Sequence, residues 1–96
     1  MIQDIFKALS DPNRRAILQL LGKRTMNAGE IADHFPLAKS TLSSHFNVLK
    51  NAGLITEEKN GTTVYYSLKM SVVEDAMAAL MNILGTGKTG KTKKGK

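Results

Sequence analysis

Residues 39–51 carry positive, hydroxyl and amide side chains and contain no aspartate or glutamate. Such groups donate hydrogen bonds, and the lysines add positive charge, so a surface made of them can approach phosphates. The same composition also fits an ordinary solvated helix face, and the neighbouring segments have to decide between the two interpretations. The side chains concerned are Lys39, Ser40, Ser43, Ser44, Asn47, Lys50 and Asn51.

The large apolar residues of this segment predict how that surface is presented. Leu42, Phe46 and Leu49 recur at i, i+4 and i+7, which places them on one stripe of a helix. We therefore expect a helix over residues 39–52 with this stripe on a core and its polar side facing outward. Gly53 should end the helix in a left-handed conformation, and an extended segment should follow.

Two short helices are predicted near the start of the chain. Residues 2–9 repeat apolar side chains at helical spacing. Asp11 is a favoured N-cap and Pro12 a favoured first residue, so a second helix is expected over residues 12–21. Arg14 and Arg15 lie in its first turns, where cations oppose the helix dipole; we interpret them as solvated arginines, with a phosphate or acidic contact as the alternative.

A third helix precedes the polar segment closely. Asn27 and Glu30 have the spacing of a capping box, which predicts a helix over residues 28–35 after a connection at residues 23–26. Pro36 and Leu37 then make a tight turn. Two short helices joined in this way form a helix-turn-helix unit, whose second helix enters the major groove of DNA.

A β-hairpin is predicted after Gly53. Residues 54–58 and 63–68 are rich in β-branched and aromatic side chains and flank Asn60-Gly61, a pair typical of type I′ turns. The hairpin projects from the end of the polar helix, as a wing does. By period two, the side chains that should face the core are Val64, Tyr66 and Leu68.

The last predicted helix is apolar on nearly every side. Ser71 and Glu74 form a second capping box, so we expect this helix over residues 72–84. So small a domain cannot bury all of that surface alone, which favours a homodimer with residues 2–9 as the neighbouring element. The residues expected at the dimer interface are Ile2, Ile5, Phe6, Val73, Met77, Leu80, Met81 and Leu84.

Length and charge divide the chain of 96 residues into two parts. Residues 1–84 should form one small domain, in which basic and acidic groups nearly balance, while residues 85–96 carry five lysines and no large apolar residue and are expected to be a disordered basic tail. The tail matches the P-loop pattern G-x-x-x-x-G-K-[ST], but it lacks the preceding strand and following helix that a phosphate-binding loop needs.

The chain has no cysteine, no apolar run long enough to span a membrane and no signal segment at its start. We expect a soluble cytoplasmic protein without membrane insertion.

Three stretches carry a family resemblance: LSDPNRRAIL at 9–18, STLSSHFNVLKNAGLI at 40–55 and VYYSL at 64–68. With the order of elements, they resemble the ArsR/SmtB winged-helix repressors, and in particular their short autorepressor type, over about residues 3–84. The resemblance implies a mainly α fold with a small β-hairpin, a winged helix-turn-helix of order α-α-α-α-β-β-α, assembled as a homodimer.

The resemblance also implies a function: binding of double-stranded DNA at a pseudo-palindromic operator, with repression as the outcome. Lysines and wing residues would contact phosphates, and short side chains of the polar helix would read base edges. The residues expected to bind DNA are Lys39, Ser40, Thr41, Ser43, Ser44, His45, Asn47, Lys50, Lys59, Asn60, Gly61 and Thr62.

Two departures from the family pattern bear on these expectations. Ala38 stands where the family usually has a capping serine. The paired cysteines near residues 27–32, and the Asp/His set of the terminal helix that metal-sensing members use, are both missing, and His34 and His45 have no ligand partners at suitable spacing. We expect no metal and no cofactor.

Two other classes of function are alternatives to repression. The runner-up is a winged-helix protein-interaction module that docks a different protein on the apolar terminal helix. An enzyme fits least, because no nucleophile, base and orienting group occur together. The resemblance leaves open control of the protein's own operon and relief of repression by an unidentified ligand or protein.

Overall fold

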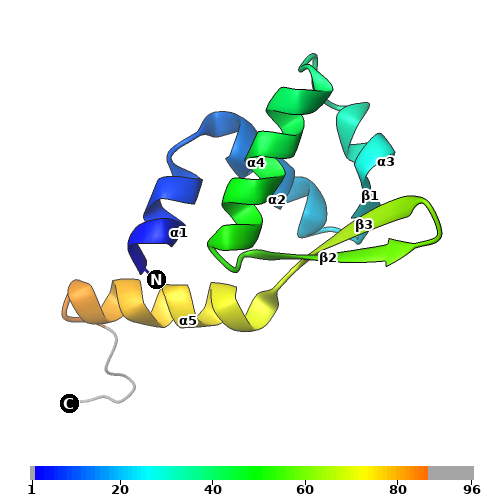
Figure 1. Cartoon of the computed structure of the whole chain (residues 1–96). Helices are drawn as coiled ribbons and strands as arrows, with labels where there is room; N and C mark the ends of the chain where they lie inside the picture. Colours follow the sequence, from blue (N-terminus) through cyan, green and yellow to red (C-terminus); the bar gives the residue numbers. More distant parts are fainter. Residues whose placement is uncertain (1, 87–96) are drawn as a thin grey trace.

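The computed structural model describes residues 2–86 and contains five helices and three strands in that range (Figure 1). The elements are α1 (Ile2–Leu9), α2 (Pro12–Leu21), β1 (Met26–Asn27), α3 (Ala28–Ala32), α4 (Lys39–Asn51), β2 (Ile55–Asn60), β3 (Thr63–Leu68) and α5 (Met70–Ile83). Most of the predicted basic tail lies outside the described residues. Among residues 2–86, no helix has the length and apolar character needed to cross a membrane.

The core forms around α4, as its apolar stripe predicts. Leu42, Phe46 and Leu49 are all buried, and the ring of Phe46 stacks on that of Tyr66 in β3, with centroids 4.3 Å apart. Val64 and Leu68 pack against the same core, so the predicted inward side of the wing is confirmed. In Figure 1, α4 stands at the centre, α5 runs beneath it and the hairpin projects to one side.

The end of α4 also follows the prediction. Gly53 has φ +78°, and the amides of Gly53 and Leu54 donate to the carbonyls of Lys50 and Leu49 at 2.8 and 3.1 Å. This is the Schellman arrangement, in which a glycine satisfies the last carbonyls of the helix. It turns the chain directly into the wing.

The wing is part of a three-stranded sheet, where the sequence predicted a hairpin alone. Strand β1 pairs antiparallel with β3, so the order is β1-β3-β2, and buried Met26 lies opposite Tyr66. The prediction of an irregular connection over residues 23–26 is therefore wrong at Met26, which belongs to β1. Two residues are too few to carry an alternation pattern, so no local signal predicts this strand.

The turn of the hairpin lies one residue later than predicted. Asn60 pairs with Thr63, so the central residues are Gly61 and Thr62, and Gly61 supplies the positive φ of +66°. Register explains the shift, because the buried ring of Tyr66 fixes which residues of β2 and β3 lie opposite one another.

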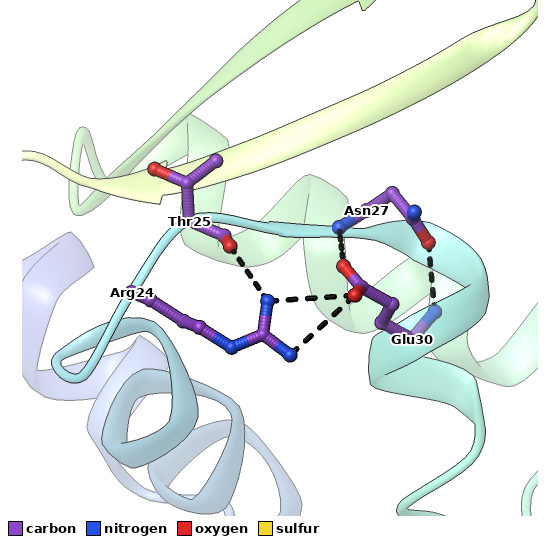
Figure 2. Close-up of polar contacts among 4 residues, drawn as sticks. All are labelled: Arg24, Thr25, Asn27 and Glu30. Carbon is purple, nitrogen blue, oxygen red and sulfur yellow. Dashed lines mark hydrogen bonds and ion pairs between the residues drawn. The ribbon is translucent and has the colours of Figure 1, made fainter.

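The capping box at the start of α3 is present, but the helix is shorter than predicted. The amides of Glu30 and Asn27 donate to each other's side chains at 2.8 and 2.9 Å, and Arg24 lies 3.4 Å from the Glu30 carboxylate (Figure 2). The Asn27 amide, followed by Arg24, lowers the pKa of Glu30, against the effect of partial desolvation.

Beyond Ala32 the chain continues in single turns rather than α-helix. The amides of His34 and Phe35 donate three residues back, to Ile31 and Ala32. Pro36 disfavours a helical conformation at the residue before it, which accounts for the early end of α3.

The capping box predicted at Ser71 is wrong. Helix α5 begins at Met70, and Lys69 occupies the N-cap position without a side-chain hydrogen bond. The amide of Lys69 donates to Leu54 at 2.8 Å, and its carbonyl accepts from Val72 and Val73. The wing thus passes into α5 without a linker, which starts the helix before Ser71 can cap it.

An ion pair joins α4 to the wing. The ammonium of Lys50 lies 2.6 Å from Oε1 of Glu57 in β2, and the two side chains are 33% and 27% exposed. The hydrogen bond from Lys50 is the largest influence on the pKa of Glu57 and lowers it, while partial desolvation opposes this.

The ion pair predicts a pH-dependent stability. Because the pKa of Glu57 is depressed on folding, the pair should stabilise the fold above the ordinary pKa of about 4.5 and lose its effect as pH falls through the folded value. Glu57→Gln should lower the free energy of unfolding at neutral pH by up to about 1 kcal/mol and by less in acid. Urea unfolding across pH measures this. Glu58→Gln is the control, since Glu58 forms no ion pair within residues 2–86; a Glu57→Gln deficit independent of pH would refute the assignment.

Candidate nucleic-acid interface

The outward face of α4 is a stripe of short polar side chains. Ser40, Ser44, Asn47 and Asn51 follow one another at i, i+4, i+7 and i+11, opposite the buried stripe, and all four are exposed. Asn51 belongs with them by spacing, although it was not among the expected DNA contacts. Lys39, Thr41 and Ser43 are also exposed around the first turns of the helix.

The start of α4 is open toward the same side. Ala38 has an extended conformation, with φ −63° and ψ 151°, and makes no side-chain cap hydrogen bond. The first amides of a helix have no partners within the helix, and together they form a site that favours phosphate oxygens. The missing cap serine thus leaves these amides to external acceptors.

The serine hydroxyls of α4 differ in what they can offer a ligand. Ser44 Oγ donates to the Ser40 carbonyl at 3.1 Å, so its proton is used inside the helix and its oxygen is left as an acceptor. Amino groups on adenine and cytosine edges are donors suited to such an oxygen.

Two arginines at the start of α2 bind the end of α1, and one of them, Arg14, also reaches α4. Arg14 donates from Nε to Ala8 and from Nη2 to Lys7, at 2.7 and 2.9 Å, and Arg15 donates to Leu9 at 2.7 Å. Both arginines therefore bind the last carbonyls of α1, and neither sequence interpretation, free solvation or a phosphate contact, described this.

His45 lies on the flank of α4 that Arg14 reaches and is half-buried. Its Nδ1 is 3.3 Å from Nη1 of Arg14. Near this pair, Asp11 caps α2 by accepting from the amides of Asn13 and Arg14 at 2.7 and 3.2 Å. Partial desolvation raises the pKa of Asp11, but these two hydrogen bonds, together with the positive charges of His45 and Arg14, outweigh it and the net pKa is lowered.

The other flank faces the wing. Lys50 was expected to contact a phosphate, but its ammonium is paired with Glu57, so in this conformation it braces the wing. A phosphate contact by Lys50 would require exchange of that partner and stays a prediction. The tip residues Lys59, Asn60, Gly61 and Thr62 are all exposed, as a DNA-contacting wing requires.

A second surface lies on α1 and α5. Five of the predicted interface side chains are at least 42% exposed: Phe6, Met77, Leu80, Met81 and Leu84. Three of them, Phe6, Met77 and Leu80, line an apolar groove of about 250 Å³ between the two helices, together with Leu9, Val73 and Ala76. Such a surface is typical of a protein interface.

The exposure of two apolar residues differs from what helical spacing predicts. Ile5 is only 2% exposed and belongs to the core, although it also lines the groove. Ile83, which was not among the predicted interface residues, is 63% exposed, because helical spacing alone does not tell which apolar residue extends beyond the core. Ile2 and Val73 are half-buried.

Comparison with known proteins agrees with this geometry. A helix-turn-helix domain family matches residues 9–58. The transcriptional repressor SdpR of Bacillus subtilis is 42% identical over 86 residues, which cover 90% of this chain and 96% of that protein. The arsenical resistance operon repressor of Staphylococcus aureus is 34% identical, with 88% of this chain and 81% of that protein covered.

Solved structures of similar fold belong to the same class of regulators. An ArsR-like transcriptional regulator from Rhodococcus sp. RHA1 superposes with a TM-score of 0.78 at 27% identity, covering 88% of this chain and 79% of that one. NolR from Sinorhizobium fredii has a TM-score of 0.67 at 32% identity, covering 86% and 83%. These relatives are regulators of transcription, a class without enzymatic activity. The chain therefore belongs to the ArsR/SmtB family of winged helix-turn-helix, DNA-binding transcriptional repressors.

Proposed function

We propose that this repressor acts in the cytoplasm as a homodimer on a pseudo-palindromic operator. The observation that carries the proposal is the division of the surface into two opposed kinds: a polar, carboxylate-free face on α4, and an apolar face on α1 and α5. The first suits DNA and the second suits another copy of the chain.

DNA reading is assigned to the outward stripe of α4. Asn47, at its centre, has the amide that pairs in bidentate fashion with adenine N6 and N7. Ser40, Thr41, Ser43, Ser44 and His45 are short enough to let the backbone approach the groove closely. Lys39, the first amides of α4 and the wing tip at Lys59–Thr62 would hold phosphates and fix the position of the protein.

Dimerisation is assigned to the groove between α1 and α5. A second copy is favoured because a two-fold pair places two α4 helices about one turn of DNA apart, roughly 34 Å, on one face of the duplex. A self-complementary apolar patch is what a two-fold interface needs. Docking of a different protein on α5 remains the competing function.

Two further parts of the proposal concern regulation. Control of the protein's own operon is inferred from the resemblance to short autorepressors. Relief of repression by a ligand or a second protein would require that partner to bind the DNA-free state more tightly than the DNA-bound state.

Reading by α4 predicts a selective loss of affinity. Asn47→Ala should weaken binding to an operator selected from random duplexes by about 1–3 kcal/mol, and binding to scrambled DNA much less, because only base contacts distinguish the two. Titration of both duplexes measures the difference. Gln19→Ala, the same kind of change on α2, should have no effect, and equal losses on both duplexes would place base reading elsewhere.

The apolar face predicts a folded monomer. Met77→Glu or Leu80→Glu puts a charge at the proposed interface, which is costly to bury unpaired. Because these side chains are 60% and 42% exposed in the single chain, the variant should keep its helices while losing dimer mass and operator affinity. Light scattering, circular dichroism and DNA titration measure the three properties.

Asn82→Glu is the matched control, a charge added at an exposed polar position of α5. It should remain dimeric. A parent protein that is monomeric yet binds a full operator, or a Met77→Glu variant that stays dimeric, would favour the competing use of α5 as a docking helix.

A further inference from the structure

Arg14 occupies an unusual place for a cation. It lies in the first turn of α2, at the positive end of the helix dipole, and is half-buried. Its guanidinium is held there by the carbonyls of Lys7 and Ala8 in the last turn of α1; the Lys7 carbonyl also accepts from the amide and the hydroxyl of Ser10. Two of its three nitrogens are thus committed to the backbone of α1, and this fixes where the third one points.

The third nitrogen, Nη1, determines which ring nitrogen of His45 carries the proton. Nη1 of Arg14 lies 3.3 Å from Nδ1 of His45. A guanidinium has only donors, so the ring nitrogen must be the acceptor and cannot carry a proton. In a neutral imidazole the proton then sits on Nε2, the nitrogen further from the backbone. No hydrogen bond joins Nε2 to another protein atom within residues 2–86.

We propose that Arg14 is a positioning residue that holds His45 as the Nε2–H tautomer, so that His45 presents a donor, and only a donor, to an acceptor on the operator. This rests on the proposed role of α4 in reading DNA. The acceptors that fit are purine N7, guanine O6, thymine O4 and a phosphate oxygen; the amino group of cytosine does not fit. Ser44, whose proton is used inside the helix, offers the complementary acceptor one residue earlier.

The tautomer is measured directly by the imidazole ¹⁵N chemical shifts of His45 in the full chain, at about pH 8, where an ordinary histidine is neutral. We expect protonated Nε2 and unprotonated Nδ1. An Nδ1–H tautomer, or a rapid mixture of the two, would overturn the proposal even if operator binding is intact. Conversely, loss of the proposed function would appear as an Asn47→Ala variant with no selective defect, whatever the tautomer of His45.

Arg14→Gln tests the positioning role, because glutamine can accept as well as donate. The His45 shifts should move toward a tautomer mixture. Arg15→Gln is the matched control: it removes a neighbouring arginine that binds the same end of α1 but does not contact His45, so the shifts should stay unchanged. Unchanged shifts in a folded Arg14→Gln variant would show that Arg14 does not select the tautomer.

Variants of His45 test the donor itself and do not depend on the folding of an Arg14 variant. The amide nitrogen of His45→Gln can replace Nε2, whereas that of His45→Asn replaces Nδ1. We expect His45→Gln to keep most of the operator affinity and His45→Asn to lose it roughly two- to tenfold, as His45→Ala does. His45→Ala binding as tightly as the parent, or Asn rescuing better than Gln, would overturn the proposal.

Modified operators identify the acceptor. A 7-deazapurine removes N7, 2-aminopurine in place of guanine removes O6, 5-methyl-2-pyrimidinone in place of thymine removes O4, and a methylphosphonate removes a charged phosphate oxygen. At the contacted position, one of these changes should weaken the parent but not His45→Ala, which assigns the acceptor to a base or to the backbone. Equal weakening of both proteins at every position would show that His45 has no acceptor on the DNA.

Discussion

Burial of the inner stripe of α4 is the constraint on which the rest of the structure depends. Leu42, Phe46 and Leu49 are each at most 4% exposed. The ring of Phe46 stacks on that of Tyr66, so α4 and β3 are joined by one aromatic contact in the core. That contact fixes the rotation of α4 about its axis and the register of the wing together. Because the stripe is buried, the opposite side must face outward, and function follows from which side chains that side carries.

Polar contacts on the two flanks of α4 complete its orientation. Arg14 reaches His45 from the α1–α2 side, and Glu57 holds Lys50 from the wing side. Partly exposed contacts of this kind add little free energy compared with the core, but they are directional. They hold the helix at an angle that the apolar contact alone would leave freer, which matters when base edges must be met within hydrogen-bond distance.

The sequence predicts two kinds of feature well: long periodic patterns and local helix caps. The helical spacing of Leu42, Phe46 and Leu49 extends over two turns, and Asp11-Pro12 and Asn27/Glu30 mark the starts of α2 and α3. The errors arise where tertiary contacts override local signals. Strand β1 exists only because β3 lies beside it, and α5 starts before Ser71 because the Lys69 amide is held by Leu54.

In the candidate site too, some features can be predicted from the sequence and others cannot. Exposure of the α4 polar stripe follows from periodicity, whereas the partners of Arg14 and Lys50 lie 31 and seven residues away in the chain and cannot be paired by spacing. Ile5 illustrates the limit most plainly. Ile5 and Phe6 are both large apolar residues of α1, yet one is 2% and the other 45% exposed, because the packing of α2, α4 and α5 around α1, which sequence spacing does not show, decides between them.

The proposed function requires two α4 helices to read one duplex together. Hydroxyl-radical footprinting of the parent protein on its selected operator measures this most directly. We predict two protected patches on one face of the DNA, related by two-fold symmetry and centred about one helical turn apart. A single protected patch at saturating protein, or protection that runs continuously around the duplex, would contradict it.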